Sequence, residues 1–210
     1  MEKVKITGII LAGGKNSRMG RDKAFLEING VKIIEGILSL FERIFEEIII
    51  VTNTPINYLY YDRATLVTDV LPGIGAIGGV YTGLFYATYE QAFICACDMP
   101  FLDRDFIRYM LKQAPNYDIV MPKSHDGFQP LHAIYSKKCL STIEKNIRER
   151  QIKIITLLNR RHKTLIIGED IINSYPHADI MFLNINTPED LKQVQEIALK
   201  KEKWPELMIS

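Results

Sequence analysis

The feature that most constrains this chain is a glycine-rich basic segment that directly follows a short apolar run near the amino terminus. The apolar run 9–11 has the length and branching of a buried central strand. Gly13 and Gly14 follow it, and because they carry no Cβ they let the backbone turn sharply and approach a ligand closely. Successive free backbone N–H groups in such a loop form a concavity that binds anions. The segment therefore predicts a phosphate site at the end of a strand.

Four cations, Lys15, Arg18, Arg21 and Lys23, follow these glycines within ten positions. Ammonium charges and forked guanidinium donors both suit phosphate oxygens. The spacing differs from the Walker A loop, which requires Gly-Lys-Ser/Thr where this chain has Gly20 followed by Arg and Asp. The Gly-x-Gly-x-x-Gly fingerprint of dinucleotide-binding folds is also absent from the segment. The loop therefore indicates a nucleoside triphosphate site of another class.

Composition limits the classes of protein to consider. With 210 residues and 47% hydrophobic content, the chain can build one substantial core. Its 26 basic and 25 acidic residues give a net charge of +1, so we expect no nucleic-acid partner. No stretch approaches the roughly 20 apolar residues of a membrane helix and no apolar signal segment is seen, which favours a cytoplasmic protein without a membrane partner. Three cysteines are too few for a disulfide framework, and Cys95 and Cys97 are expected to pack, reduced, on one strand face.

Short branched runs alternate with helical patterns along the chain, which is typical of an α/β fold with a mostly parallel sheet flanked by helices. Helical spacing extends over 33–45, and the last helix has a readable start, where Thr187 can cap and Pro188 suits the first helical position. The expected strands are 9–11, 48–52, 66–68, 92–97, 118–121, 131–135, 164–167 and 180–184, and the other expected helices are 77–88, 103–113, 138–148 and 154–158.

Polar side chains follow several of these strands, where ligands of open α/β sheets collect. Asp98 follows the apolar strand 92–97 and is a candidate ligand of Mg²⁺, which prefers carboxylates and substrate phosphates. Asp69 could accept hydrogen bonds from a guanine edge, and Asn53 could bind a base or ribose or simply form a turn. The glycine-rich segment 72–79 could hold a flat base, or its glycines could serve close packing of a helix on the sheet.

The segment from Leu11 to Lys23 resembles the signature Leu-Ala-Gly-Gly-x-Ser-x-Arg-Met-Gly-x-Asp-Lys of the nucleotidyltransferases. The most similar family is that of the molybdenum cofactor guanylyltransferases. The resemblance continues through 129–133 and 184–190, so that it covers essentially the whole chain. In that family the second glycine segment commonly reads Gly-Pro-Leu-x-Gly, whereas Ala76 and Ile77 replace the Pro-Leu pair here.

The resemblance implies a Rossmann-like nucleotidyltransferase fold in a single domain, 1–210, whose amino-terminal half binds nucleotide and whose carboxyl-terminal half binds the acceptor. It implies transfer of GMP from GTP to molybdenum-bound molybdopterin with release of pyrophosphate, and possible transient contact with molybdoenzyme apoproteins. The phosphate of the acceptor is already a nucleophile, and the sequence offers no credible catalytic triad. The implied site comprises backbone contacts of Leu11, Ala12 and Gly13 with GTP, phosphate contacts of Lys23 and Arg18, guanosine contacts of Asn53 and Asp69, and Mg²⁺ on Asp98. Gln129, Asn184 and Asn186 would face the acceptor or help to hold the metal.

Two alternatives stay open from the sequence. One is another nucleotidyltransferase on the same scaffold, such as a molybdopterin cytidylyltransferase or a sugar-phosphate or alcohol-phosphate cytidylyltransferase. The other is a nucleotide-binding protein that delivers the cofactor without catalysis, against which the presence of both Lys23 and Asp98 argues. His132 lies within an expected strand and is interpreted as a packed histidine rather than a catalytic base.

Overall fold

The computed structural model describes residues 3–13 and 22–200 of the chain. Its centre is a sheet of eight strands in the order β10-β7-β9-β6-β1-β4-β5, with β8 paired to β7. The β6-β1-β4-β5 half and the β10/β7 pair are parallel, while β9 runs antiparallel to both of its neighbours. The expected mostly parallel sheet is therefore confirmed. The strands are β1 (Val4–Leu11), β4 (Phe45–Val51), β5 (Thr65–Val67), β6 (Gln91–Ala96), β7 (Ile119–Ser124), β8 (Gly127–Phe128), β9 (His132–Ser136) and β10 (Thr164–Ile167).

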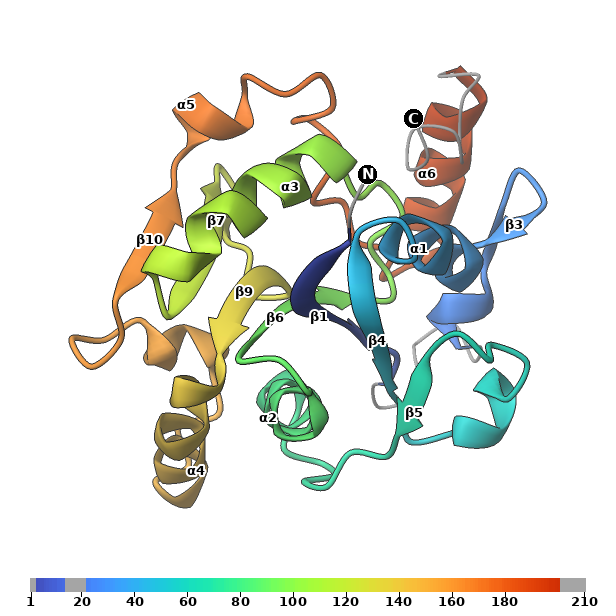
Figure 1. Cartoon of the computed structure of the whole chain (residues 1–210). Coiled ribbons are helices and arrows are strands. Elements are labelled where there is room, and N and C mark those ends of the chain that lie inside the picture. The colour runs from blue at the N-terminus through green and yellow to red at the C-terminus, as the bar shows by residue number, and fades with distance from the viewer. Residues whose placement is uncertain (1–2, 14–21, 201–210) are drawn as a thin grey trace.

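Helices cover both faces of the sheet. Figure 1 shows α1, α3 and α6 on one face and α2 and α4 on the other. A two-stranded hairpin, β2 (Glu27–Ile28) with β3 (Val31–Lys32), precedes α1. The α-helices are α1 (Ile33–Phe41), α2 (Ala76–Tyr86), α3 (Arg104–Gln113), α4 (Leu140–Arg148), α5 (Glu169–Ile172) and α6 (Pro188–Lys200); the short 3₁₀ turns are η1 (Lys23–Phe25), η2 (Pro55–Tyr58), η3 (Ala114–Asn116), η4 (Lys137–Cys139) and η5 (Ile154–Leu157).

The central strand β1 contributes to both hydrophobic layers because its side chains alternate across the sheet. Ile10 packs in the layer under α1 and α3, whereas Ile9 and Leu11 pack in the layer under α2 and α4. Since both faces of the sheet are covered, the last part of β1, residues 9–11, is apolar up to the glycine-rich segment. Helix α2 lies close to this strand because Gly83 leaves room: a Cβ there would come within 2.7 Å of Ile9 Cγ2.

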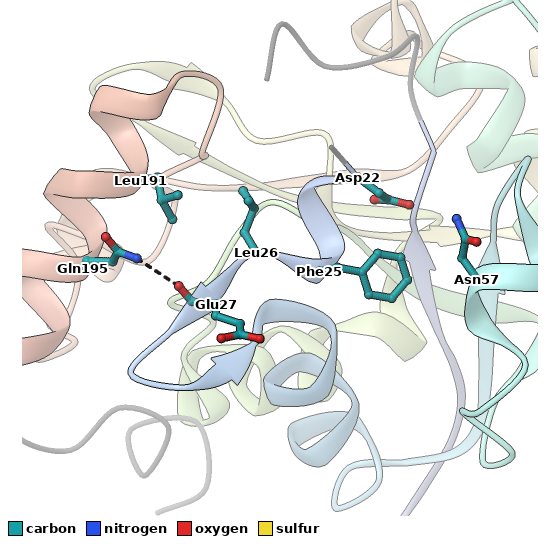
Figure 2. A pocket seen from close by; sticks show the side chains of 7 residues that line it. All are labelled: Asp22, Phe25, Leu26, Glu27, Asn57, Leu191 and Gln195. Carbon is teal, nitrogen blue, oxygen red and sulfur yellow. Dashed lines mark hydrogen bonds between the residues drawn. The ribbon is translucent and has the colours of Figure 1, made fainter. Parts of the chain in front are cut away.

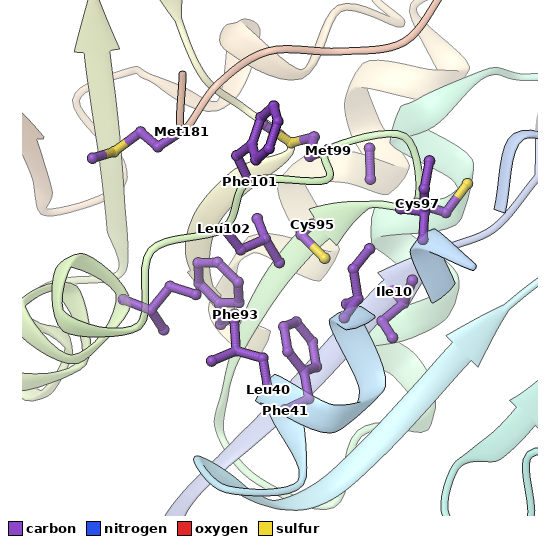
Figure 3. Packing of buried hydrophobic residues seen from close by; sticks show 14 of the residues in the cluster. Ile10, Leu40, Phe41, Phe93, Cys95, Cys97, Met99, Phe101, Leu102 and Met181 are labelled. Carbon is purple, nitrogen blue, oxygen red and sulfur yellow. The ribbon is translucent and has the colours of Figure 1, made fainter. Parts of the chain in front are cut away.

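The layer under α1 and α3 also contains two of the cysteines. Cys95 and Cys97 are both buried, and Figure 3 shows them among the apolar side chains of Phe93, Met99 and Leu102. Burial raises the pKa of the Cys97 thiol above its usual range, with the nearby Asp98 carboxylate adding to the effect. The packing role expected of this pair is confirmed.

Two expected elements differ from the structure. The helix expected over 33–45 ends at Phe41, and Phe45 begins β4. The strand expected at 180–184 is wrong: the segment forms turns, in which Ile180 N donates to His177 O and Leu183 N donates to Ile180 O. Ile180 and Met181 of this run are buried and Phe182 and Leu183 are partly buried; the run lies against α3, where the Phe182 and Phe106 ring centroids are 6.0 Å apart. The backbone N–H groups of Ile180, Met181 and Leu183 donate to carbonyls within the segment 177–180, so their burial did not require pairing with the sheet.

The start of α6 confirms the cap expected from sequence. Asp190 N donates to Thr187 Oγ1, and the Asp190 carboxylate accepts from Thr187 N in return. This reciprocal pair is a capping box, which satisfies donors that the first helical turn leaves free. Among the residues described, no helix is long and apolar enough to cross a membrane.

His132 is fully buried on β9, which confirms the packing role expected of it. The rings of Phe93 and Phe182 lie 5.1 Å from its ring centroid, and that of Phe106 lies 5.8 Å away. Neither ring nitrogen has a hydrogen-bond partner among the residues that the structure describes. Burial without a compensating partner lowers the pKa of His132 to about 3.

This histidine should make the fold sensitive to acid. Below a pH of about 6.5 the unfolded chain binds a proton at His132 that the folded chain excludes, so stability falls as pH falls toward the folded pKa. We expect His132→Leu to shrink the loss of unfolding free energy between pH 7 and pH 5 by about 2 kcal/mol. Urea unfolding of both proteins at the two pH values measures this difference. Parallel pH profiles would show that His132 accepts its proton without unfolding.

Candidate nucleotide site

Four residues that follow strands form a row along one edge of the sheet. Gly13, Asn53, Asp69 and Asp98 each lie two residues beyond the last residue of a strand, namely β1, β4, β5 and β6. These four strands are adjacent and parallel, so their carboxyl ends meet at the same edge. Ligands of open α/β sheets bind at this edge. The tertiary structure therefore brings together the strand-end residues that the sequence singled out.

The start of the glycine-rich segment, Leu11 to Gly13, lies at this edge between β6 and β4. Leu11 O accepts a hydrogen bond from Cys97 N on one side, and Ala12 N donates to Val51 O on the other. A Cβ at Gly13 would lie 3.7 Å from both the backbone N and the Nδ2 of Asn53. Gly13 and Asn53 therefore border the same space at the ends of β1 and β4.

The polar contacts of Lys23 join three segments that are distant in the sequence. Lys23 Nζ lies 2.9 Å from Asp98 Oδ2 and donates to Asn186 Oδ1 at 2.7 Å. The side chains of Lys23 and Asp98 keep only 19% and 17% of their surface exposed, so water screens the ion pair only in part. Two oxygen atoms thus converge on one cation at the edge of the sheet.

Asn186 is held in place from the carboxyl-terminal side. Its backbone N donates to the Asp190 carboxylate at 2.8 Å, which extends the capping box of α6 by one residue. These backbone hydrogen bonds lower the pKa of Asp190, so the cap stays charged near neutral pH. Ile185 N donates to Asp98 O at 3.0 Å. The 185–187 strip is therefore fixed both to α6 and to the loop that carries Asp98.

Asp69 is oriented by helix α2. Its Oδ1 accepts from Thr82 Oγ1 at 2.9 Å and from Leu71 N at 3.0 Å, and Thr82 Oγ1 also accepts from Val70 N. Gly78 permits this arrangement: a Cβ there would lie 2.8 Å from Leu71 O and 3.4 Å from both carboxylate oxygens of Asp69. At Gly78 the glycine serves close packing, which brings the Asp69 loop onto α2. That the segment 72–79 holds a base stays a prediction.

An open hollow of about 610 Å³ adjoins the turn that carries Lys23. Figure 2 shows its lining: the η1 side chain Phe25, with Asp22 and Leu26 flanking that turn, Asn57 on one side and α6 on the other. Gln195 Nε2 of α6 donates to Glu27 O at 3.1 Å and closes one end of it. The hollow is partly apolar and carries carboxylate and amide groups.

The other predicted residues either have hydrogen-bond partners other than Lys23, Asp98 and Asn186 or lie outside the structure described. Arg18, like Lys15 and Arg21, falls in the segment 14–21, outside the described residues. Gln129 Nε2 donates to Ser124 Oγ at 2.9 Å, within the β7/β8 turn region. Asn184 is exposed, and its Nδ2 donates to Phe182 O. The acceptor roles of Gln129 and Asn184 remain predictions.

The donor set fits a hard divalent cation. Asp98 Oδ2 and Asn186 Oδ1 already surround a positive charge, that of Lys23. Oxygen ligands suit Mg²⁺, which proteins usually hold with one or two carboxylates together with substrate phosphates and water. Within 3–13 and 22–200 no cluster of three or more His, Cys, Asp or Glu side chains could hold a metal alone. Asp98 and Asn186 are therefore suited to a metal that arrives with a phosphate ligand.

Two supporting residues escaped sequence reasoning. Thr82 lies in the middle of an apolar helix, where a buried hydroxyl is a weak signal of a polar partner. Asp190 is recognisable as a cap from its spacing to Thr187, but its bond to Asn186 N depends on how the preceding strip folds. Thr82 lies in no motif, and Asp190 ends the segment 184–190, whose resemblance implied roles only for Asn184 and Asn186.

Comparison with known proteins agrees with this geometry. The model of the MobA-like NTP transferase domain matches residues 8–164. The molybdenum cofactor guanylyltransferase of Desulfosudis oleivorans is 35% identical over 93% of this chain and 96% of its own length, and a probable one of Pelotomaculum thermopropionicum is 32% identical over 93% and 94%. The crystal structure of molybdopterin-guanine dinucleotide biosynthesis protein A from Archaeoglobus fulgidus superposes with a TM-score of 0.80 at 26% identity, covering 93% of this chain and all of that one.

The mostly parallel sheet flanked by helices is a Rossmann-like fold, and the matched domain and relatives show that the chain is a nucleotidyltransferase. Within that class, the chain belongs to the MobA-like NTP transferase family, as the domain match and the relatives above 30% identity show.

Thr82 should support the site without touching nucleotide. Thr82→Val keeps the shape of the side chain but leaves Val70 N and Asp69 Oδ1 without that partner, so we expect a loss of about 1–2 kcal/mol in unfolding free energy and weaker nucleotide binding. Urea unfolding and calorimetric titration with nucleotide measure the two effects.

The matched control is Thr142→Val. Thr142 is also a buried helical threonine, and its hydroxyl lies 2.9 Å from His162 Nε2 on the α4 side, away from the strand-end row. It should lose similar stability and keep full nucleotide affinity. Equal nucleotide affinity in both variants would contradict the role given to Thr82.

Proposed function

We propose that this protein transfers GMP from GTP to the terminal phosphate of molybdenum-bound molybdopterin, forming the guanine dinucleotide form of the cofactor and pyrophosphate. The observation that carries the proposal is the convergence of Lys23, Asp98 and Asn186 at the edge of the sheet where β1 ends and the glycine-rich segment begins. The names of the relatives support the choice of guanine and of the acceptor. We place nucleotide binding in the amino-terminal half, acceptor binding in the carboxyl-terminal half and the reaction in the cytoplasm.

The reaction needs no protein nucleophile. An oxygen of the acceptor phosphate, already anionic, attacks the α-phosphorus of GTP; the new O–P bond forms as the bond to the β-phosphate oxygen breaks, and pyrophosphate leaves with that electron pair. No proton has to move in this step. Catalysis then consists of holding two anions together and compensating the charge that develops on the leaving group.

Each residue has a separate part in this proposal. The backbone of Leu11, Ala12 and Gly13 contacts the nucleotide, and Lys23 with Arg18 compensates phosphate charge. When bound, Mg²⁺ on Asp98 would supply further neutralisation of the triphosphate. Lys23 pairs with Asp98 in the structure described, so binding of the triphosphate gives its ammonium group a new anionic partner. Asn53 and Asp69 lie at the strand ends where a nucleoside would sit, and we assign them to guanosine.

Asp98 should be needed for turnover. Asp98→Asn keeps an oxygen for Lys23 but removes the charge that would hold Mg²⁺, so we expect pyrophosphate release to fall by about 100-fold or more at fixed Mg²⁺. The assay contains GTP, MgCl₂ and molybdenum-bound molybdopterin. The control is Asp105→Asn, an exposed carboxylate paired with Arg104, which should match the parent. An Asp98→Asn enzyme as active as the parent would overturn the metal assignment.

Base selection is tested by titrating the parent with GTP, CTP, ATP and UTP. GTP should bind most tightly, and Asp69→Asn should lower its affinity by about tenfold, because the new amide group faces the guanine donors with a donor of its own. The substitution keeps one oxygen to accept from Thr82 and Leu71, so the loop should hold its place.

Tight binding of CTP with none of GTP would replace the proposal by a cytidylyltransferase. Binding of GTP without pyrophosphate release under any acceptor condition would instead favour a protein that delivers the cofactor without catalysis.

A further inference from the structure

Tyr58 has a buried hydroxyl that the proposed reaction does not yet use. The side chain is fully buried at the end of η2, and its ring packs on Phe25 with centroids 4.9 Å apart. Its hydroxyl donates to Asp22 Oδ2 at 2.8 Å. Tyr58 and Asp22 are 36 positions apart in the sequence, so this bond ties the segment after β4 to the turn before Lys23.

The two oxygens of Asp22 have different partners. Oδ2 accepts from Tyr58, whereas Oδ1 accepts from Ala24 N at 3.1 Å and caps the η1 turn. Phe25 N and Leu26 N complete this turn by donating to Asp22 O and Lys23 O. Lys23 is the first residue of η1, so the backbone from which its side chain extends is fixed by the carboxylate that Tyr58 holds.

At its other end, Lys23 reaches the reacting centre. Its Nζ lies between Asp98 Oδ2 and Asn186 Oδ1. A chain of contacts therefore runs from Tyr58 through Asp22 and the η1 turn to the ammonium group of Lys23. Tyr58 also lies on the same connection after β4 as Asn53, the candidate nucleoside contact. The hydrogen bond from Tyr58 to Asp22 therefore links the connection that carries Asn53 to the turn that carries Lys23.

The hydroxyl is suited to a fixed donor role. Burial raises the pKa of Tyr58 far above its usual range, with the nearby Cys97 and the Asp22 carboxylate acting in the same direction. The phenol therefore keeps its proton at every working pH. The ring packs on Phe25, and the hydroxyl makes a separate contact, its hydrogen bond to Asp22.

Resting on the proposed transfer reaction, we propose that Tyr58 is a positioning residue: through Asp22 its hydroxyl sets the backbone of the η1 turn and hence the place of Lys23 on the triphosphate. Loss of the hydroxyl leaves Asp22 Oδ2 without this donor and lets the turn shift. A misplaced cation weakens compensation of charge in the transition state more than it weakens binding of the ground state.

The test compares Tyr58→Phe with Tyr61→Phe. Tyr61 follows three positions later and its hydroxyl also donates to a carboxylate, Glu35 Oε1 at 3.3 Å, on the α1 side. Tyr58→Phe should lower kcat by about tenfold with less than about threefold change in KM for GTP, whereas Tyr61→Phe should match the parent. A fall in thermal stability with unchanged kcat would assign Tyr58 to structure alone and overturn the proposal.

A second pair of variants tests the route through Asp22. Asp22→Asn keeps an oxygen for the η1 cap but disturbs the carboxylate that Tyr58 holds. If the hydroxyl acts through Asp22, adding Tyr58→Phe to Asp22→Asn should cause no further loss. The kcat of this double variant should then equal that of Asp22→Asn alone within about twofold. Independent, multiplying losses in kcat would overturn the route. Asp22→Asn also serves as the readout if Tyr58→Phe does not fold.

A chemical readout separates this proposal from the proposed function. Acetylation of single lysines by an amine-reactive ester, followed by mass spectrometry, reports the exposure of Lys23 without any substrate. Lys145 is the internal reference, because it is a more exposed lysine on α4 with its own partner, Glu149, and neither tyrosine bonds to that pair. Tyr58→Phe should raise the rate at Lys23 severalfold relative to Lys145, and Tyr61→Phe should not.

If the parent makes no pyrophosphate from GTP and the acceptor, the proposed function fails while the labelling still decides the position of Lys23. If the parent is active and Tyr58→Phe equals Tyr61→Phe in kcat and in labelling, the positioning role fails while the proposed function stands.

Discussion

The site depends on one ammonium group, that of Lys23, held between Asp98 and Asn186. The three residues come from the start, the middle and the end of the described chain. Ion pairs that remain in contact with water contribute about 1 kcal/mol or less to stability, so the fold does not need this contact to stay folded. Its importance is positional. It fixes a cation, a carboxylate and an amide oxygen together at the carboxyl edge of the sheet.

The surrounding structure serves this arrangement in layers. The buried parallel strands align their carboxyl ends, and Gly13, Asn53, Asp69 and Asp98 follow at the same offset. Behind them lies a set of hydrogen bonds that hold these groups: Thr82 for Asp69, Asp190 for Asn186, and Asp22 for the turn of Lys23. A site for a flexible, highly charged substrate requires such support, because small displacements of a charged group reduce catalysis strongly.

Much of the fold could be predicted because hydrophobic period and turn residues act locally. The strands of the parallel half and helices α2, α3 and α6 lie close to the predicted ranges, and Thr187 caps its helix as its spacing indicated. The errors have separate causes. Ile180 is buried and Phe182 partly buried outside the sheet, with Phe182 against Phe106 of α3, and an apolar run looks the same in either setting. The β2/β3 hairpin was missed because its strands are two residues each.

The sequence by itself determined the type of site: a glycine-rich basic loop after a strand, an acid after another strand, and a resemblance that covers the chain. These are local patterns, set by backbone geometry and by the chemistry of single residues. Only the tertiary structure decided which groups meet. Lys23 and Asn186 are 163 positions apart, and no periodicity relates them; the order of the strands and the path of the chain after α5 bring them into contact. The bond from Tyr58 to Asp22 arises in the same way, because a buried hydroxyl takes the partner that packing places beside it.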